Sequence, residues 1–248
     1  FMAGIMQHIE EAGIHSGDSA CVLPAYELPS HARINIENYT RKLAISLNTV
    51  GLINIQFAMK KNVVYVIEVN PRASRTIPFI SKVIDIPLAK IAAQISVGKK
   101  IKELKLNKSK KKLIAIKKPV FPFNKFPNQS LFLSPEMKST GEVIGFDTFL
   151  GSAYAKAESG SGNSLPTSGS IFISVNDSDK IKIIPLARDF KELGFDIIAT
   201  EGTAKLLLEN GITTNSIFKV GEGRPNIVDA IKNGDIQLVL NTPLGAQS

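Results

Sequence analysis

The sequence is poor in cysteine and contains no long apolar run, and each absence excludes a class of protein. Cys21 is the only cysteine among the 248 residues. A lone cysteine excludes a disulfide framework and a thiolate metal site, which is typical of the reducing cytosol. No apolar run approaches the length that crosses a bilayer, and the chain opens at Phe1 on an amphipathic stretch rather than a signal peptide. We therefore expect a cytoplasmic protein that makes no membrane contact.

Aromatic residues are missing from the most basic part of the chain. The formal net charge is +8, and the lysines cluster between 99 and 118, where the run KSKKK occupies 108–112. A surface that binds single-stranded nucleic acid interleaves aromatic residues with basic ones, whereas a bare lysine run is typical of a solvated loop. We therefore expect no nucleic-acid partner.

The chain also lacks a methionine at position 1. Because it enters what resembles the middle of a domain directly after Phe1, we expect a fragment of a longer protein. With 248 residues, of which 44% are hydrophobic and 21% charged, the composition is ordinary for a globular protein. This length is sufficient for two hydrophobic cores, and we expect two domains.

Two apolar strands joined by a short polar turn dominate the stretch from Gly51 to Lys82. The alternation predicts a hairpin that turns at residues 60–62 and is followed by an arginine-rich loop. Successive side chains on a strand point to opposite faces. The odd positions are therefore expected to form one apolar core face, made of Ile53, Ile55, Phe57, Met59, Val63, Tyr65, Ile67 and Val69.

The even positions of the same hairpin carry polar side chains, namely Asn54, Gln56, Glu68 and Asn70. A hairpin that closes around Lys61 places Gln56 opposite Val66 and diagonal to Glu68, near enough for both polar side chains to reach one ligand. A carboxylate with amide oxygens suits Mg²⁺, which takes its other ligands from nucleotide phosphates and water. From spacing alone, the simpler interpretation is a hairpin whose outer face is polar because it is solvated.

Arg72 and Arg75 follow the second strand within a few residues. Their forked guanidinium groups can hold a carboxylate or a phosphoryl group in transfer. Together with a magnesium site, they make ATP chemistry the first hypothesis for this domain.

Helical periodicity predicts two helices around the hairpin, over 31–48 and over 86–98. The first is expected to pack on the hairpin through Ile34, Tyr39, Leu43, Ile45 and Leu47, and the second to begin near Pro87 and stop at Gly98. The segment GIHSGDS (13–19) gathers small residues around His15, which lets the backbone approach a ligand, although such clusters are usually plain loops.

A Gly/Ser/Pro cluster at 159–170 predicts a loop and a domain boundary. Strands over 171–175, 195–199, 216–220 and 236–240 then alternate with helices over 179–193, 203–210 and 226–232, which predicts a parallel α/β sheet. Ligands of such sheets collect at the carboxyl ends of the strands. The residues at those ends suit a phosphate: Ser174, Thr200, Glu201, Gly202, Thr203, Lys219, Asn241 and Thr242, with Lys180 nearby. Without a family, ATEGT (199–203) is explained more simply as a helix N-cap.

Three segments of the first domain are similar to segments of one enzyme family. VIEVNPRASRTIPF (66–79), GIHSGDS (13–19) and PEMKSTGEV (135–143) resemble the carbamoyl phosphate synthase large chain, an ATP-grasp ligase. The resemblance implies that residues 1–158 form the C-terminal part of its second ATP-grasp unit, an incomplete α+β domain.

The same resemblance implies site residues. In that family the residues that match Gln56, Glu68 and Asn70 hold Mg²⁺ or Mn²⁺, and those that match Arg72 and Arg75 line the phosphoryl-transfer site. It further implies ATP contacts from Gly13, Ile14, His15, Ser16, Gln56 and Glu68.

The second domain resembles the methylglyoxal synthase-like regulatory domain that ends the same large chain, notably in VGEGRPNIVDAIKNG (220–234). The resemblance implies that residues 168–248 form a parallel-sheet α/β domain that binds a nucleotide effector such as UMP or IMP. The residues that match the effector pocket are Ser174, Lys180, Thr200, Thr203, Lys219, Asn241 and Thr242.

Two departures leave the identity of the effector open. Pro243 stands where some relatives carry a hydroxyl, and Glu201 places a negative charge where some carry histidine, beside the expected phosphate. Methylglyoxal synthases proper use a histidine and an aspartate, but the histidines here, His8, His15 and His31, all precede this domain. We therefore expect regulation, not catalysis, from it.

As a whole, the resemblance implies ATP-dependent phosphorylation of carbamate to carbamoyl phosphate, for pyrimidine and arginine biosynthesis. It also implies a glutaminase small chain as partner and an oligomer in the full-length form. The isolated chain is expected to be inactive, because an ATP-grasp site closes ATP between two subdomains and the sequence offers no candidate for the other one. The alternatives are a nucleotide effector-binding module with no ATP site and, disfavoured by the regulatory domain, a biotin carboxylase-type ligase.

Overall fold

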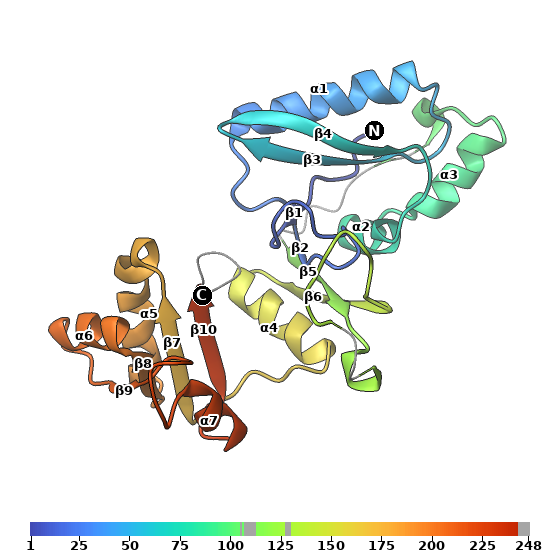
Figure 1. The fold of residues 1–248 in the computed structure, drawn as a ribbon. Coiled ribbons are helices and arrows are strands. Elements are labelled where there is room, and N and C mark those ends of the chain that lie inside the picture. Colours follow the sequence, from blue (N-terminus) through green and yellow to red (C-terminus); the bar gives the residue numbers. More distant parts are fainter. Residues whose placement is uncertain (105, 107–112, 127–129, 243–248) are drawn as a thin grey trace. The chain divides into compact units, whose positions relative to one another are not determined.

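The computed structural model describes residues 1–104, 106, 113–126 and 130–242. The chain folds into two compact units, Phe1–Ser164 and Leu165–Ser248 (Figure 1). The lysine run at 108–112 and Pro243 lie outside the described residues, so the expectations that concern them stay predictions.

A four-stranded antiparallel sheet lies at the centre of the first unit. Its order is β1-β2-β5-β6, formed by β1 (Gln7–His8), β2 (Cys21–Leu23), β5 (Ile114–Val120) and β6 (Gly141–Asp147). The sheet fastens together parts of the chain that are more than a hundred residues apart in sequence.

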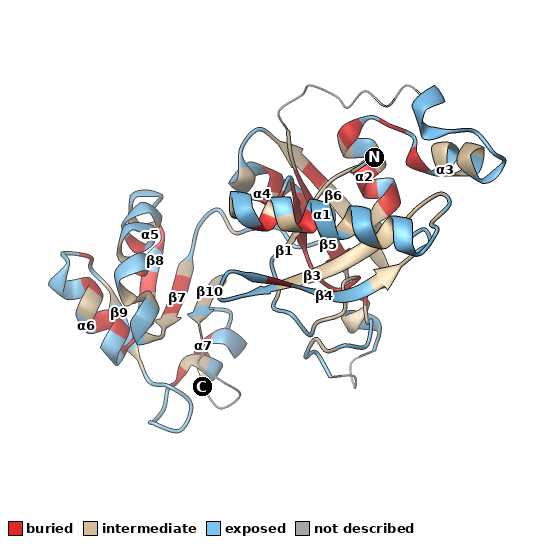
Figure 2. Cartoon of the chain, turned by 90° about the horizontal axis from the view of Figure 1, so that it is seen from above, coloured by how far each residue is buried: buried red, intermediate tan, exposed pale blue. Residues whose placement is uncertain are grey.

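Helices cover both faces of this sheet, because neighbouring strand residues point to opposite sides. Leu23 and Ala115 pack in a cluster with α2 (Thr76–Ile84) and with Leu88 of α3 (Leu88–Ser96). Their chain neighbours Val22 and Ile116 pack against α4 (Leu150–Gly160). Figure 2 shows the buried residues concentrated in this sheet and in α2. The predicted helix over 86–98 is confirmed as α3.

The predicted hairpin is present as β3 (Asn54–Lys60) and β4 (Val63–Asn70), with α1 (Ser30–Ser46) beside β4 (Figure 1). Its turn contains only Lys61 and Asn62, both with positive φ, of 48° and 65°. Two residues in that conformation make the mirror-image turn that matches strand twist. Lys60 therefore belongs to the strand and pairs with Val63.

The predicted core face of the hairpin is wrong for β4, and the length of the turn explains the error. In β3 the prediction holds for Phe57, which packs against the buried cluster of Ala32, Ile36 and Val64. A turn of residues 60–62 would pair Met59 with Val63, whereas the two-residue turn pairs Met59 with Val64. Because one residue of register moves a strand's side chains to the other face, Val64 is buried in β4 while Val63, Tyr65 and Ile67 are exposed.

The predicted packing face of α1 is wrong in the same region. Ala32 and Ile36, one helical turn apart, are buried and pack with Val64. Of the predicted contact residues Leu43 is half-buried, and the other four are exposed: Ile34, Tyr39, Ile45 and Leu47. The helix itself is confirmed, but a small contact made through alanine and one isoleucine replaces the broad apolar stripe that we expected.

The second unit alternates strands and helices in the predicted order. Its elements are β7 (Ser170–Val175), α5 (Lys180–Glu192), β8 (Asp196–Thr200), α6 (Glu201–Glu209), β9 (Asn215–Ile217), α7 (Ile227–Lys232) and β10 (Leu238–Thr242). The sheet order is β10-β7-β8-β9, and every pair is parallel. The predicted parallel α/β sheet is confirmed, although its last strand begins two residues later than expected.

The core of the second unit lies under α5 and α6. Alternate strand residues, Ile171, Ile173, Ile197 and Ala199, share one cluster with Ile183 and Ala187 of α5 and Ala204 and Leu207 of α6. Because all the strands are parallel, their carboxyl ends, which carry candidate effector residues, lie at one edge of the sheet. Short 3₁₀ turns lie at Ile101–Glu103, Phe123–Lys125 and Asp177–Asp179. No helix within the described ranges is long and apolar enough to cross a membrane.

Candidate nucleotide and effector sites

The polar face of the hairpin brings the predicted metal ligands closer together than the sequence suggested. Gln56 lies directly opposite Glu68, not opposite Val66, and Asn54 lies opposite Asn70. The register shifts between Gln56 and Phe57, where Ile67 of β4 is left without a partner as a β-bulge. The two-residue turn alone would shift Glu68 and Asn70 to the face opposite Gln56. The extra residue of the bulge shifts them back, so one face carries all the polar side chains.

The side chains of this face have oxygen atoms available to a ligand. Asn70 Nδ2 donates a hydrogen bond of 2.8 Å to Glu68 Oε1. The amide oxygen of Asn70 takes no part in this bond and can accept from or coordinate a ligand. Glu68 is exposed, and Gln56 and Asn70 are half-buried. One carboxylate and two amide oxygens fit a hard divalent cation that shares its ligands with phosphates. Among the described residues no cluster of three or more His, Cys, Asp and Glu could hold a metal, so no stronger competing site lies in that part of the chain.

The two predicted arginines lie in the loop that continues from this face. The Arg72 backbone N–H donates to the Asn70 carbonyl at 2.8 Å, and its Nη1 donates to the Ala73 carbonyl at 2.9 Å. Arg75 precedes the first residue of α2, and its Nη1 lies 3.3 Å from Ser139 Oγ and 3.2 Å from Met137 Sδ. Arg75 is therefore held by the PEMKSTGEV segment, whereas Arg72 bonds only locally among the described contacts.

Two hydroxyls connect the arginine loop to the hairpin. Asn54 Nδ2 donates to Thr76 Oγ1 at 3.4 Å, and Thr76 Oγ1 lies 2.5 Å from Ser74 Oγ. Both hydroxyls flank Arg75 in sequence. The polar face of the hairpin and the loop that carries Arg75 are therefore joined by hydrogen bonds.

The GIHSGDS loop closes on itself through His15. The Asp18 N–H donates to the His15 carbonyl at 2.9 Å, and the Gly17 N–H donates to His15 Nδ1 at 3.0 Å. A Cβ at Gly17 would lie 2.9 Å from Met137 Sδ and 3.1 Å from His15 Nδ1, so a larger residue would displace these side chains. The loop thus presents backbone and histidine side chain in one fixed arrangement.

Asp18 fastens this loop to PEMKSTGEV, a role that the sequence did not reveal. Its fully buried carboxylate accepts the backbone N–H groups of Lys138 at 2.7 Å and Ser139 at 2.9 Å. Ser139 Oγ donates to the Gly17 carbonyl at 3.1 Å. Burial works to raise the pKa of Asp18, but the hydrogen bonds from Ser139 and Lys138 outweigh it and hold that pKa below the ordinary carboxyl value.

Ser139 joins the pieces of the candidate nucleotide site. Its hydroxyl bonds Gly17 of the loop and lies beside the guanidinium of Arg75. The segment 135–143, which had a family resemblance but no chemical explanation, therefore connects the GIHSGDS loop to Arg75. The sequence offered one sign of Asp18, its place among the small residues of the GIHSGDS loop. Nothing in the sequence indicated that it would bind the backbone of Lys138 and Ser139.

The predicted effector residues gather at the carboxyl ends of the strands in the second unit. Ser174 of β7 lies opposite Asn241 of β10. Thr200 and Thr203 are buried where β8 runs into α6. Lys180 Nζ lies 3.7 Å from the position that a Cβ at Gly202 would occupy, so its ammonium group reaches the first turn of α6. Glu201 is exposed in that same turn.

Three further residues at this edge were not foreseen. The Asn176 backbone N–H donates to Thr242 Oγ1 at 3.1 Å, so the predicted Thr242 hydroxyl is already used. Asp177 Oδ1 lies 2.6 Å from Lys180 Nζ, and the hydrogen bond to Lys180, with a smaller effect of Lys219, lowers the pKa of Asp177. Asp179 accepts from the Asn176 amide at 2.9 Å. Lys180 and Lys219 therefore both lie near one carboxylate, that of Asp177.

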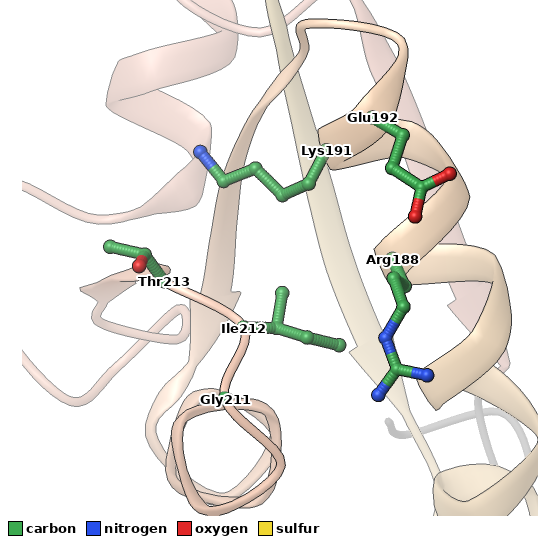
Figure 3. A pocket seen from close by; sticks show the side chains of 6 residues that line it. All are labelled: Arg188, Lys191, Glu192, Gly211, Ile212 and Thr213. Atoms are coloured by element: carbon green, nitrogen blue, oxygen red, sulfur yellow. The ribbon is translucent and has the colours of Figure 1, made fainter.

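A separate shallow cavity of about 330 Å³ lies at the opposite end of this sheet (Figure 3). Its walls come from the end of α5 and from the segment before β9, with Arg188, Lys191, Glu192 and Ile212 among them. Lys191 Nζ lies 3.3 Å from Asp196 Oδ1, and Glu192 adds a second carboxylate. None of the predicted effector residues lines this cavity.

Two family models match the chain, one in each unit. The carbamoyl-phosphate synthase L chain, ATP binding domain, matches residues 3–104, and the MGS-like domain matches residues 182–248. With the observed sheets, these matches confirm the predicted fold class of an ATP-grasp domain followed by a parallel-sheet α/β domain.

Curated relatives match over nearly the whole chain. It is 56% identical over 251 residues to the carbamoyl phosphate synthase large chain of Acidobacterium capsulatum and 57% identical over 246 residues to that of Archaeoglobus fulgidus. Each alignment covers 98% of this chain and 23% of the relative. The carbamoyl phosphate synthase large chain, C-terminal section, of Aquifex aeolicus is 49% identical, with 98% of this chain and 49% of the relative covered. The chain thus spans between 23% and 49% of the length of these relatives.

Proposed function

Because the chain belongs to the carbamoyl phosphate synthase large-chain family, we propose that it takes part in the ATP-dependent phosphorylation of carbamate to carbamoyl phosphate. Residues 1–158 are assigned to the C-terminal part of the second ATP-grasp unit. Residues 168–248 are assigned to its methylglyoxal synthase-like regulatory domain. The division of the structure between Ser164 and Leu165 supports this assignment.

The pairing of Gln56 with Glu68 on one open sheet face is the observation that carries the proposal. A merely solvated hairpin needs no particular register, whereas here a bulge sets an amide, a carboxylate and a second amide beside one another. Mg²⁺ or Mn²⁺ held by Gln56, Glu68 and Asn70 would neutralise charge on the nucleotide phosphates. ATP would also contact Gly13, Ile14, His15 and Ser16.

The transfer step is assigned to the residues beside that face. Arg75 is held against Ser139, so its guanidinium is oriented before any ligand arrives. Arg72, exposed in the same loop, can turn toward a phosphoryl oxygen. Two cations near the transferring group would stabilise the charge that spreads over its oxygens.

The wider assignment follows the family. We assign the protein to the cytoplasm, to pyrimidine and arginine biosynthesis, and to an oligomeric complex with a glutaminase small chain. The regulatory domain is assigned a nucleotide monophosphate effector such as UMP or IMP, held by Lys180, Lys219 and the hydroxyl groups of its strand ends. The second candidate function, an effector-binding module with no ATP site, is favoured only by the parallel-sheet edge just described.

Metal dependence tests the ATP site. We expect titration calorimetry to detect ATP binding to this chain with Mg²⁺ present and to show affinity weaker by at least about tenfold after chelation with EDTA. The physical reason is that Glu68 alone would repel the phosphates when no cation lies between them. AMP serves as the control ligand, because it lacks the outer phosphates. Equal affinity with and without metal, or no binding of ATP in either condition, would contradict the assignment.

The regulatory domain is tested by Lys219→Ala. We expect this substitution to weaken binding of UMP or IMP by about tenfold, because it removes one of the two cations that face the candidate phosphate position. Lys191→Ala is the matched control, since it removes a lysine at the opposite end of the same sheet. If the chain binds UMP or IMP but does not bind ATP with Mg²⁺, the result supports the second candidate function, an effector-binding module with no ATP site. Equal losses in both variants would refute the proposed pocket.

A further inference from the structure

A buried lysine with no carboxylate partner lies beneath the candidate nucleotide loop. Lys117 of β5 is 1% exposed, and among the described residues no ion pair involves it. It stands in a cross-strand row with Cys21 of β2 and His8 of β1. A buried ammonium group is costly unless something accepts its hydrogen bonds, so its contacts define what it does.

Lys117 has two described hydrogen-bond partners, the neighbouring Cys21 thiol and a backbone carbonyl of the candidate nucleotide loop. Lys117 Nζ donates to the Ser16 carbonyl at 3.1 Å, across 101 residues of sequence. The next N–H along the chain belongs to Gly17 and donates to His15 Nδ1 at 3.0 Å. The Ser16 carbonyl and the Gly17 N–H are the two ends of one peptide group.

The planarity of that peptide couples the two contacts. Because the group is rigid and trans, fixing the direction of its carbonyl fixes the opposite direction of its N–H. Since Nδ1 accepts a hydrogen bond, a neutral His15 carries its proton on Nε2. Nε2 is then a donor that can meet an acceptor oxygen of a ligand.

From these contacts we infer that Lys117 is a positioning residue of the nucleotide site, which fixes the ring orientation and the Nε2–H tautomer of His15 through the Ser16–Gly17 peptide. This inference rests on the proposed function for the ligand, a nucleoside triphosphate with its cation. The part of the inference that concerns the His15 tautomer is independent of the proposed function, because the tautomer is a property of the chain without ligand.

Two measurements on the 248-residue chain test the inference. Nitrogen-15 NMR of the imidazole rings reports the tautomer directly, and only three histidines contribute signals. The wild-type chain should show His15 protonated on Nε2, and Lys117→Met should raise the share of the Nδ1–H form. In calorimetry, Lys117→Met should weaken ATP binding with Mg²⁺ by about tenfold.

Lys118→Met is the matched control. Lys118 is adjacent in sequence but points to the other face of the sheet, where it pairs with Glu158 at 2.5 Å. It should leave both the tautomer and the affinity unchanged. An Nδ1–H tautomer in the wild-type chain would overturn the inference even if Lys117→Met failed to fold. So would a folded Lys117→Met chain with wild-type tautomer and affinity. If the wild-type chain binds no ATP but its tautomer still depends on Lys117, the positioning link holds and the proposed ATP site is wrong.

Discussion

Replacing Glu68 with glutamine is expected to weaken binding of ATP with Mg²⁺ by about 100-fold, while leaving the fold intact. Glu68 supplies the only carboxylate of the Gln56, Glu68 and Asn70 set, and its side chain is exposed. A neutral amide of the same size keeps the hairpin surface but offers a divalent cation much less charge. The loss should therefore appear in nucleotide affinity and not in thermal stability.

The measurement is calorimetric titration with ATP at saturating Mg²⁺, together with thermal unfolding of each variant. Glu37→Gln is the control, because Glu37 is an equally exposed acid on α1 and its loss changes the net charge by the same amount. If the two variants bound ATP equally well, long-range charge would explain any loss of affinity, and the assignment of Glu68 as a metal ligand would be wrong. Unchanged binding in Glu68→Gln would have the same consequence.

Local pattern was enough to predict the elements that build this site. Alternation located both strands of the hairpin, and helical spacing located α1 and α3. The alternation of strands and helices in the second unit was sufficient for its parallel sheet, because that connection allows few other arrangements.

Register and distant contacts could not be predicted in the same way. The face that β4 buries depends on whether its turn has two or three residues, and the position of Gln56 depends on a bulge at Ile67. Asp18 meets the Lys138 N–H across 120 residues, and no periodicity of either segment encodes that contact. These features arise when the sheet assembles, so the sequence pointed to the candidate ligands but not to the residues that hold them in place.

Asp18 is the residue whose loss should damage the first unit most. We expect Asp18→Asn to lower its free energy of unfolding by about 3 kcal/mol near neutral pH, because the new amide turns a donor toward a buried backbone N–H. Urea denaturation followed by circular dichroism measures the change, with hydrogen exchange to assign the transition to this unit. Asp147→Asn is the control, since Asp147 bonds Lys156 at 2.7 Å and two backbone N–H groups at the surface. Its loss should cost much less.

The pH dependence of this loss separates a charge effect from a change of shape. The folded pKa of Asp18 is held below its unfolded value, so its carboxylate contributes full stability above the unfolded value of about 3.9. That contribution disappears as the pH falls through the folded pKa. The difference between wild type and Asp18→Asn should therefore be largest near neutral pH and shrink in acid. A difference that stays constant would mean that the charge on Asp18 does not fasten the nucleotide loop to residues 138 and 139.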